Sequence, residues 1–304
     1  MQIPSIKIKY SFNKETEIFL DFLHHPQFPQ HRNMIFRAFK ELKIAFNKKN
    51  GLEEKLIIKN FIKNFRKKHN YKIKKIINQS KKLLKQNSKK ALVRLGLLTD
   101  YQWLKNENYY AFPTILPFSP YKKNIFFFSI LGAIYNNKQH NILFVSIHEI
   151  SHFIVYKTLK KFYDKKISLK KESFYFLKEI LAPVIMNQKP LQSLLKIRNY
   201  LGNPFLRYIF IINKNKKIQI TTFFQRIYEK ARYGGKMDFK QILEIMALLI
   251  FSIENELIKK NKIWNQYGND LINNKTAFKK YCQPIKIEAP EQLFNRSNRR
   301  SGRC

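Results

Sequence analysis

Residues 141–160 read NILFVSIHEISHFIVYKTLK, with the pattern H-E-I-S-H at 148–152. Between 142 and 155 the titratable side chains all belong to this pattern, so the stretch predicts a helix that is buried on most sides. On a helix, residues four positions apart lie on the same face, one turn from each other. The imidazoles of His148 and His152 are therefore expected to converge on one point.

Two converging imidazoles and an adjacent glutamate are the groups that a zinc hydrolase needs. Imidazole nitrogen is a common zinc ligand, and H-E-x-x-H places two of them on one helix face. Glu149 stands about 100° around the helix from His148, so it reaches a zinc-bound water rather than a ligand position. We predict that His148 and His152 bind zinc and that Glu149 takes the proton of that water. The alternative is a buried helix with two hydrogen-bonded histidines and a capped glutamate.

The segment resembles the zincin metallopeptidases. Their pattern has a small β-branched residue three positions before the first histidine, uncharged inner positions and an apolar residue two positions after the second histidine. These positions are held here by Val145, Ile150, Ser151 and Ile154. The resemblance covers about residues 140–187 and implies a zinc-dependent peptidase acting on a peptide or protein. It also implies a mostly helical α+β fold with a zincin-like core, in which a small antiparallel sheet lies beside the H-E-x-x-H helix.

A catalytic zinc takes three protein ligands, so a third must lie elsewhere in the chain. The zincins with three histidines have glycine three residues after the second histidine and a further histidine three residues later. Val155 and Thr158 occupy those positions, and no histidine follows His152. That subgroup is excluded, and a downstream carboxylate is expected instead, as in the gluzincins.

Three carboxylates are candidates, and they differ in context. Asp164 lies in a lysine-rich turn and would suit the zincins with an aspartate ligand. Glu172 follows His152 by 20 residues, a spacing similar to the thermolysin group, but near a helix N-terminus the dipole stabilises a glutamate without metal. Glu179 lies in the apolar run FYFLKEILAPVIMN, where burial of a carboxylate is costly unless a cation pairs with it.

We favour Glu179 as the third ligand, and the stretch around it is also similar to that of uncharacterised bacterial H-E-x-x-H proteins. Glu172 is the first alternative, and either glutamate can serve as an outer partner of the other. Thermolysin-like gluzincins have an aspartate four residues beyond the third ligand to orient a histidine. Here Pro183 follows Glu179 at that spacing, so the outer partner is not identified, and Asn187 or a backbone carbonyl are the candidates.

The composition supports a folded protein and leaves a second function open. The chain of 304 residues is 44% hydrophobic, unlike a disordered chain, and carries a net charge of +39. Lysine, asparagine, isoleucine, phenylalanine and tyrosine all have A/T-rich codons, so we attribute the charge mainly to composition bias. Weak, salt-sensitive binding to nucleic acid follows from it in any case. The alternative function is a basic nucleic-acid- or ribosome-associated protein with a non-catalytic metal site.

The remaining expectations concern location and organisation. Two cysteines, Cys282 and Cys304, predict no disulfide framework and favour a cytoplasmic location. No signal peptide is evident, and the longest apolar runs we identify are shorter than a membrane span. We expect a helical N-terminal region, a zincin-like catalytic region with C-terminal helices, and a basic disordered tail, at 1–106, 107–283 and 284–304.

Strands are predicted in three places. Alternating apolar residues predict a strand within 5–12. The aromatic and β-branched runs at 109–116 and 125–134 predict an antiparallel pair directly before the motif, and their prolines favour the first strand as the edge strand that binds an extended substrate. Residues 209–222 predict a hairpin across 213–217.

Overall fold

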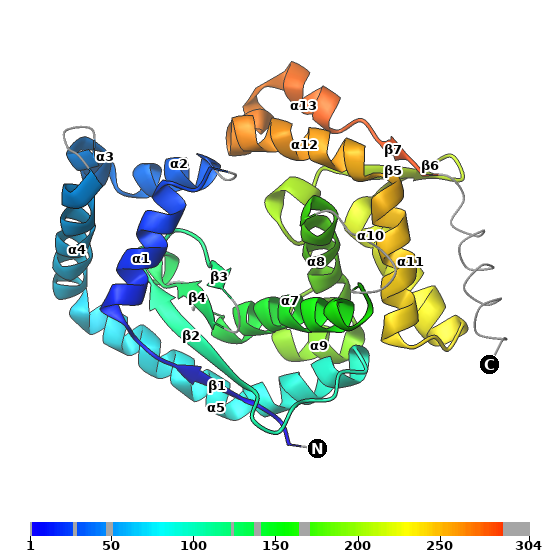
Figure 1. The fold of residues 1–304 in the computed structure, drawn as a ribbon, viewed down its shortest axis with the longest axis horizontal. Helices are drawn as coiled ribbons and strands as arrows, with labels where there is room; N and C mark the ends of the chain where they lie inside the picture. The colour runs from blue at the N-terminus through cyan, green and yellow to red at the C-terminus, as the bar shows by residue number, and fades with distance from the viewer. Residues whose placement is uncertain are drawn as a thin grey trace. The chain divides into compact units, whose positions relative to one another are not determined.

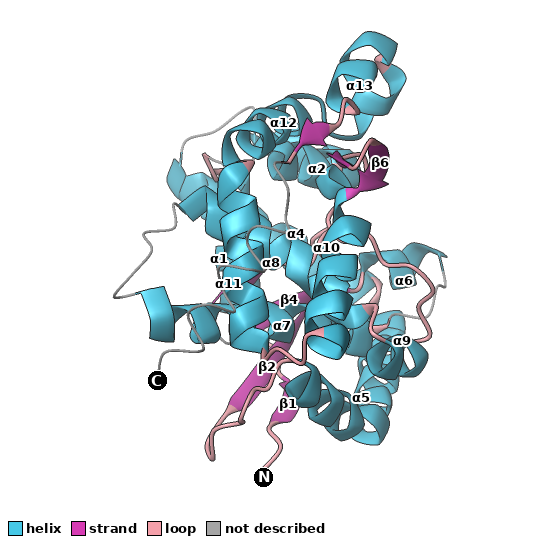
Figure 2. Cartoon of the chain, turned by 90° about the vertical axis from the view of Figure 1, so that its right-hand side faces the viewer, coloured by secondary structure: helices cyan, strands magenta, loops and turns pink. Residues whose placement is uncertain are grey.

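The computed structural model describes residues 2–26, 29–46, 51–122, 125–136, 141–163 and 171–287. The chain forms two compact units. Unit 1 contains Met1–Leu92 and Trp103–Ser146, and unit 2 contains Val93–Gln102 and Ile147–Cys304. Figure 1 shows the order of the elements, and Figure 2 shows that the strands are short and that helix predominates. The prediction of a mostly helical α+β protein is confirmed at this level.

Unit 1 begins with a strand and a series of helices. The helices are α1 (Phe12–Leu23), α2 (Pro29–Ala38), α3 (Lys40–Phe46), α4 (Gly51–Lys68) and α5 (Asn70–Leu98), the last of which continues into unit 2, and α6 (Leu131–Asn136) follows the sheet. Phe39, between α2 and α3, packs edge-on against Phe61 and Phe65 of α4 and so joins this junction to α4. Residues 87–90 contain no glycine or proline, and α5 runs through them without a break.

The sheet of unit 1 has the strand order β1-β2-β4-β3. Its strands are β1 (Ser5–Ile8), β2 (Asn108–Thr114), β3 (Tyr121–Lys122) and β4 (Ile125–Ser129). β2 pairs in parallel with both β1 and β4, while β3 pairs antiparallel with β4. The predicted strand near the N-terminus is confirmed, but the prediction that β2 and β4 form an antiparallel pair is wrong.

The connection between β2 and β4 explains this difference. The connection contains β3, which forms a hairpin with β4 and thereby sends β4 in the direction of β2. The Phe127 N–H donates to the Pro120 carbonyl at 2.7 Å, so the connection packs along β4. β2 is an interior strand, and the prediction that it is the edge is also wrong. Pro113 is tolerated there because β1 ends its pairing at Ala111.

Unit 2 contains most of α7 (Ile142–Tyr163), which begins in unit 1. Its other regular elements are α8 (Lys171–Met186), α9 (Lys189–Leu195), β5 (Phe210–Asn213), β6 (Lys216–Gln219), α10 (Ile220–Glu229), α11 (Phe239–Ser252), α12 (Glu254–Tyr267), α13 (Lys275–Tyr281) and β7 (Ile285–Lys286). Short 3-10 turns occur at Pro204–Leu206 and Gly268–Asn273, and a π turn at Lys230–Gly234.

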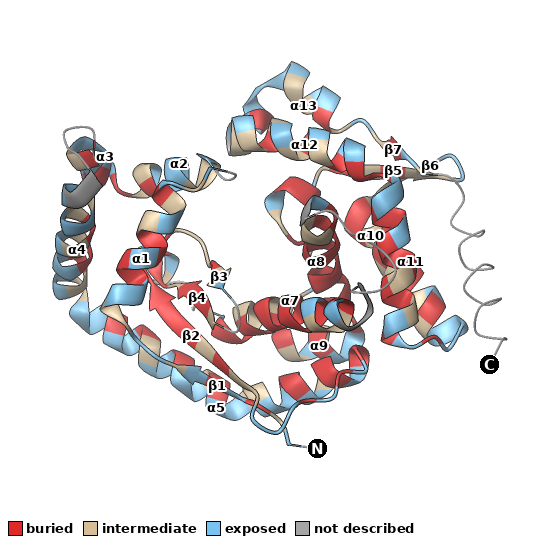
Figure 3. Cartoon of the chain, in the orientation of Figure 1, coloured by how far each residue is buried: buried red, intermediate tan, exposed pale blue. Residues whose placement is uncertain are grey.

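α8 is the central helix of unit 2. It packs against α10, α11 and α12, and Figure 3 shows most of it buried. The Ser173 hydroxyl donates to the carboxylate of Glu254 and so links α8 to α12 inside the unit. The predicted hairpin is confirmed in kind: β5 and β6 are antiparallel and joined through Lys214 and Asn215, both with positive φ, as a tight hairpin turn requires. Its turn is shorter than the predicted 213–217, and residues 220–222, predicted as part of the hairpin, begin α10. β7 pairs with β5, so the predicted tail begins within an ordered strand, and 288–304 lies outside the described residues.

Among the described residues, one stretch has the length and composition of a membrane span. It is Ile142–Lys160 in α7, and 67% of its 18-residue window is buried in the protein. The prediction that no apolar run reaches this length missed it because the polar motif interrupts the run. The interior helix of a folded protein passes the same test, so length and composition do not place α7 in a membrane.

Candidate metal centre

α7 carries the H-E-x-x-H motif on one continuous helix, as predicted. Its Glu149 and His152 side chains are buried, and His148 is partly buried. The Nε2 atoms of His148 and His152 lie 3.0 Å apart, with the two rings nearly perpendicular. Two nitrogens on a tetrahedral zinc, each about 2.0–2.1 Å from the ion, stand roughly 3.3 Å apart. The separation of the imidazoles is therefore close to the one that a shared zinc would require.

α8 brings Glu179 to the same point. Its Oε1 lies 3.6 Å from Nε2 of His152, and the ligand atoms of His148, His152 and Glu179 all lie within 4.8 Å of one another. Glu172 lies at the start of α8, is exposed and does not belong to this group. Asp164 lies outside the described residues. Of the two candidates that the structure describes, Glu179 is the one that lies beside the histidines.

The electrostatic surroundings keep both histidines neutral. Burial lowers the pKa of His148, although Glu179 raises it, and Lys178 lowers it further. Burial lowers the pKa of His152 well below its ordinary value, and His148 and Lys178 act in the same direction. A neutral imidazole is the form that binds metal. The donor set of two neutral imidazoles and a carboxylate thus fits a zinc ion.

Glu149 is a buried carboxylate with an unsatisfied oxygen. Its side chain is 5% exposed, and within the described part of the chain no hydrogen-bond donor reaches its Oε2. Burial raises the pKa of Glu149 well above its ordinary value, and the charge of Glu179 adds to the effect. A buried acceptor without a donor is costly, and such atoms are rare in folded proteins. This oxygen is suited to holding a proton that comes from a bound molecule.

Sequence reasoning missed three side chains that contact the cluster. The Tyr200 hydroxyl lies 3.2 Å from Nδ1 of His148, and Asn203 Nδ2 donates to Oε2 of Glu179 at 3.4 Å. The Lys178 ammonium lies 3.6 Å from Oε1 of Glu179. Neither Tyr200 nor Asn203 carried a signal, since the sequence has 16 tyrosines and the pair Asn203-Pro204 indicates only a break in regular structure.

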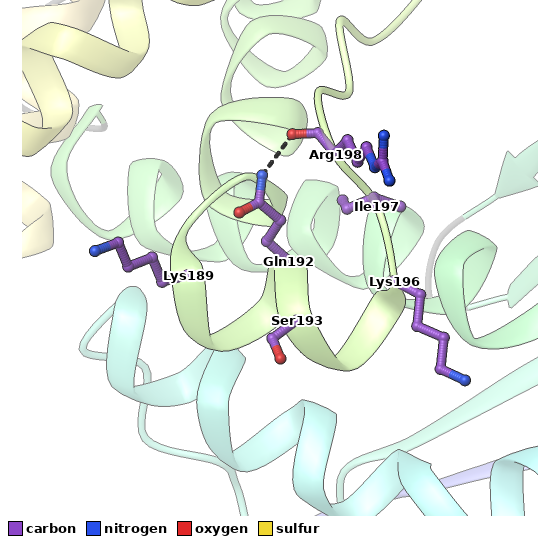
Figure 4. A pocket seen from close by; sticks show the side chains of 6 residues that line it. All are labelled: Lys189, Gln192, Ser193, Lys196, Ile197 and Arg198. Atoms are coloured by element: carbon purple, nitrogen blue, oxygen red, sulfur yellow. Dashed lines mark hydrogen bonds between the residues drawn. The ribbon is translucent and has the colours of Figure 1, made fainter.

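A separate hollow in unit 2 has no part in this cluster. It has a volume of about 530 Å³ and is lined by Lys189, Gln192, Ser193, Lys196, Ile197 and Arg198. Figure 4 shows that its three cationic side chains point in different directions, while Gln192 donates to the Arg198 carbonyl at 2.6 Å. Because the cations diverge, the hollow does not form a single anion site.

The chain matches no protein-family model, and no curated protein and no solved structure resembles it significantly. The likeness to zincins therefore stays a resemblance of the motif and its flanks.

Proposed function

We propose that this protein is a zinc-dependent metallopeptidase in which His148, His152 and Glu179 hold the metal and Glu149 is the catalytic base. The proposal is supported by one observation above all, namely the convergence of two imidazole nitrogens from α7 and a carboxylate oxygen from α8. Two histidines and a glutamate form a ligand set of catalytic zinc that leaves a position for water or substrate. The cytoplasmic location and a peptide or protein substrate belong to the same proposal.

In the proposed reaction, the metal and the side chains have different roles. Zinc, when bound, polarises a carbonyl and lowers the pKa of water. Glu149 Oε2 accepts the proton of the attacking water and then delivers it to the leaving nitrogen of the cleaved peptide bond. Its raised pKa suits the first of these steps, because a carboxylate with an ordinary pKa takes a proton only weakly from water, although it releases that proton readily. His148 and His152 stay neutral throughout.

Metal analysis of the purified protein tests the ligand assignment. We expect one equivalent of zinc in the wild type, loss of that zinc in Glu179→Ala and retention in Glu172→Ala. The two variants are a matched pair, because both remove a glutamate from α8 but only Glu179 lies in the cluster. Absence of zinc from the wild type would overturn the proposal. Cleavage is then assayed on a mixed peptide library, since an enzyme with one target protein would leave generic substrates intact.

The net charge of +39 favours a second function, a basic nucleic-acid- or ribosome-associated protein with a non-catalytic metal site. Charge attraction alone weakens steeply with salt. Two results together would support this function over the peptidase: RNA or DNA stays bound at about 200 mM salt, and no peptide is cleaved.

A further inference from the structure

We propose that the segment 200–203, which follows α9, forms the outer shell of the metal centre. In this arrangement Tyr200 positions His148, and Asn203 positions Glu179. The inference rests on the metal site of the proposed function but not on peptide cleavage. It identifies the orienting groups for which the sequence offered only Asn187 or a backbone carbonyl.

Tyr200 lies where a ligand histidine needs a partner. With Nε2 directed at the metal, neutral His148 carries its proton on Nδ1 and donates it to the Tyr200 oxygen, 3.2 Å away. The two rings also meet nearly at right angles, with centroids 5.8 Å apart. Together these contacts fix both the tautomer and the orientation of the ligand ring, as the outer partners of metal-bound histidines do.

Asn203 acts on the third ligand in a similar way. Its Nδ2 donates to Oε2 of Glu179 at 3.4 Å and lies 3.3 Å from the hydroxyl of Tyr175. One carboxylate oxygen is thereby engaged, while the other, Oε1, faces His152. The amide thus favours binding of the metal through Oε1 alone.

The segment is held against α8 by residues spaced four apart, namely Glu179, Pro183 and Asn187, which lie on one helix face. The buried Asn187 side chain accepts from the Tyr200 N–H at 2.9 Å and donates to the Tyr200 carbonyl at 2.8 Å. Asn187 therefore serves the site indirectly, by clamping the backbone of the residue that touches His148.

Gly202 allows the segment to approach this face closely. Its φ is +78°, and a Cβ there would lie 2.9 Å from Pro183 Cγ and 3.2 Å from the carbonyl oxygen of Glu179. Pro183 has no N–H, so the Glu179 carbonyl lacks its usual helical donor at the point where the segment packs. The contact between segment 200–203 and α8 is therefore specific to this part of the helix. It depends on Gly202 and on the four-residue spacing of Glu179, Pro183 and Asn187.

Zinc affinity of the metal-free protein, measured by competition with a chelator, tests the inference. Tyr200→Phe keeps the ring and removes the oxygen, so we expect zinc binding about 10–100-fold weaker and an altered absorption spectrum of bound Co²⁺. Tyr228→Phe is the control: it also deletes a buried hydroxyl of unit 2, which donates to the Leu98 carbonyl, and should leave both readouts unchanged.

A second variant keeps the test decisive if Tyr200→Phe folds poorly. Asn203→Ala does not touch His148, and it should also weaken zinc binding because Glu179 loses its donor. Wild-type affinity in both variants would overturn the inference while leaving the metallopeptidase standing. Reduced cleavage at unchanged zinc affinity in Tyr200→Phe would also overturn it, since the tyrosine would then contact the substrate. Weaker zinc binding in a protein that cleaves no peptide would support the inference and contradict the proposed function.

Discussion

Each unit of the chain buries a carboxylate, Glu15 in unit 1 and Glu149 in unit 2, and their surroundings differ. Glu15 is 1% exposed, and Arg66 donates to its Oε2 at 2.7 Å while the Ile115 N–H donates to its Oε1 at 2.9 Å. Glu149 is 5% exposed, and no described residue donates to its Oε2. Burial raises the pKa of both carboxyls, but Arg66 and two hydrogen-bond donors oppose this for Glu15.

Burial alone therefore does not identify a functional carboxylate. In unit 1 the fold supplies every partner of Glu15, so the ion pair joins α1 to α4 and to the segment after β2, and Arg66 also donates to the Pro113 carbonyl. In unit 2 the fold leaves Glu149 with an open acceptor beside three potential ligands. The first arrangement satisfies the carboxylate within the fold, whereas the second leaves an oxygen that the proposed function assigns to a bound water.

The largest effect is expected from Glu149→Gln. Loss of the base should lower the rate of peptide cleavage by about 10²–10⁴-fold. Zinc content should stay at one equivalent, and thermal unfolding should occur at the same temperature or higher, because the variant replaces a buried carboxylate by an uncharged amide of the same shape. Metal analysis measures the zinc content, a cleavage assay measures the rate, and calorimetry measures the unfolding temperature. Unchanged cleavage would show that Glu149 is not the base.

In unit 1, removing the cation that pairs with Glu15 should lower the stability of the protein. Arg66→Met leaves Glu15 buried without its cation, which should lower the free energy of unfolding by about 3–5 kcal/mol. Arg226→Met is the control, because Arg226 is exposed on α10 and surface changes usually stay within about 0.5 kcal/mol. Urea unfolding measures both. A small effect of Arg66→Met would mean that the ion pair contributes little, and the contrast between the two carboxylates would fail.

The two carboxylates also show what sequence can and cannot predict. His148 and His152 followed from helix geometry, and Glu179 from the cost of a carboxylate in an apolar helix. Those arguments need only local spacing and burial. Glu15 has no such local signal, because its partners lie 51 and 100 residues further along the chain. Tyr200 was equally hidden, since a side-chain clamp from another element places it.

The predicted pairing of β2 with β4 was wrong for the same reason, namely that it depends on distant contacts. A connection of this length between β2 and β4 is compatible with either direction, and the outcome depends on β3 taking one edge of β4. β1 contributes a further partner from about 100 residues away. Local patterns thus identified the strands and the confirmed hairpin at β5–β6, whereas the order and direction of the first sheet depend on contacts that no local pattern encodes.

A smaller effect should follow from changing Lys178, a cation beside the proposed metal ligand Glu179. Its ammonium lies 3.6 Å from Oε1 of Glu179 and competes with a metal for that oxygen. Lys178→Met should therefore strengthen zinc binding by up to about tenfold, since partly buried charges at this distance interact by a few kcal/mol at most after solvation. Lys178→Arg keeps the positive charge, so it should leave zinc binding unchanged. Weaker zinc binding in Lys178→Met would show that the ammonium supports the ligand instead of opposing the metal.

The smallest effect is expected at Asp100, a third carboxylate of intermediate kind. Burial raises the pKa of Asp100, but hydrogen bonds from Arg232 and the Phe239 N–H, with the guanidinium charge, outweigh this and lower it below its ordinary value. A lowered folded-state pKa contributes stability that is present above the unfolded pKa of about 3.9 and is lost as the pH falls through the folded value.

The pair is partly exposed, so Asp100→Asn should cost no more than about 1 kcal/mol at pH 7. The difference between wild type and variant should shrink as the pH falls below the unfolded pKa of about 3.9 and through the lowered folded pKa of Asp100, because both proteins then carry a neutral side chain. Urea unfolding across this pH range measures it. A difference that does not change with pH would mean that Asp100 contributes through its hydrogen-bond geometry alone, and that in this chain the charge of a carboxylate matters only where it is fully buried.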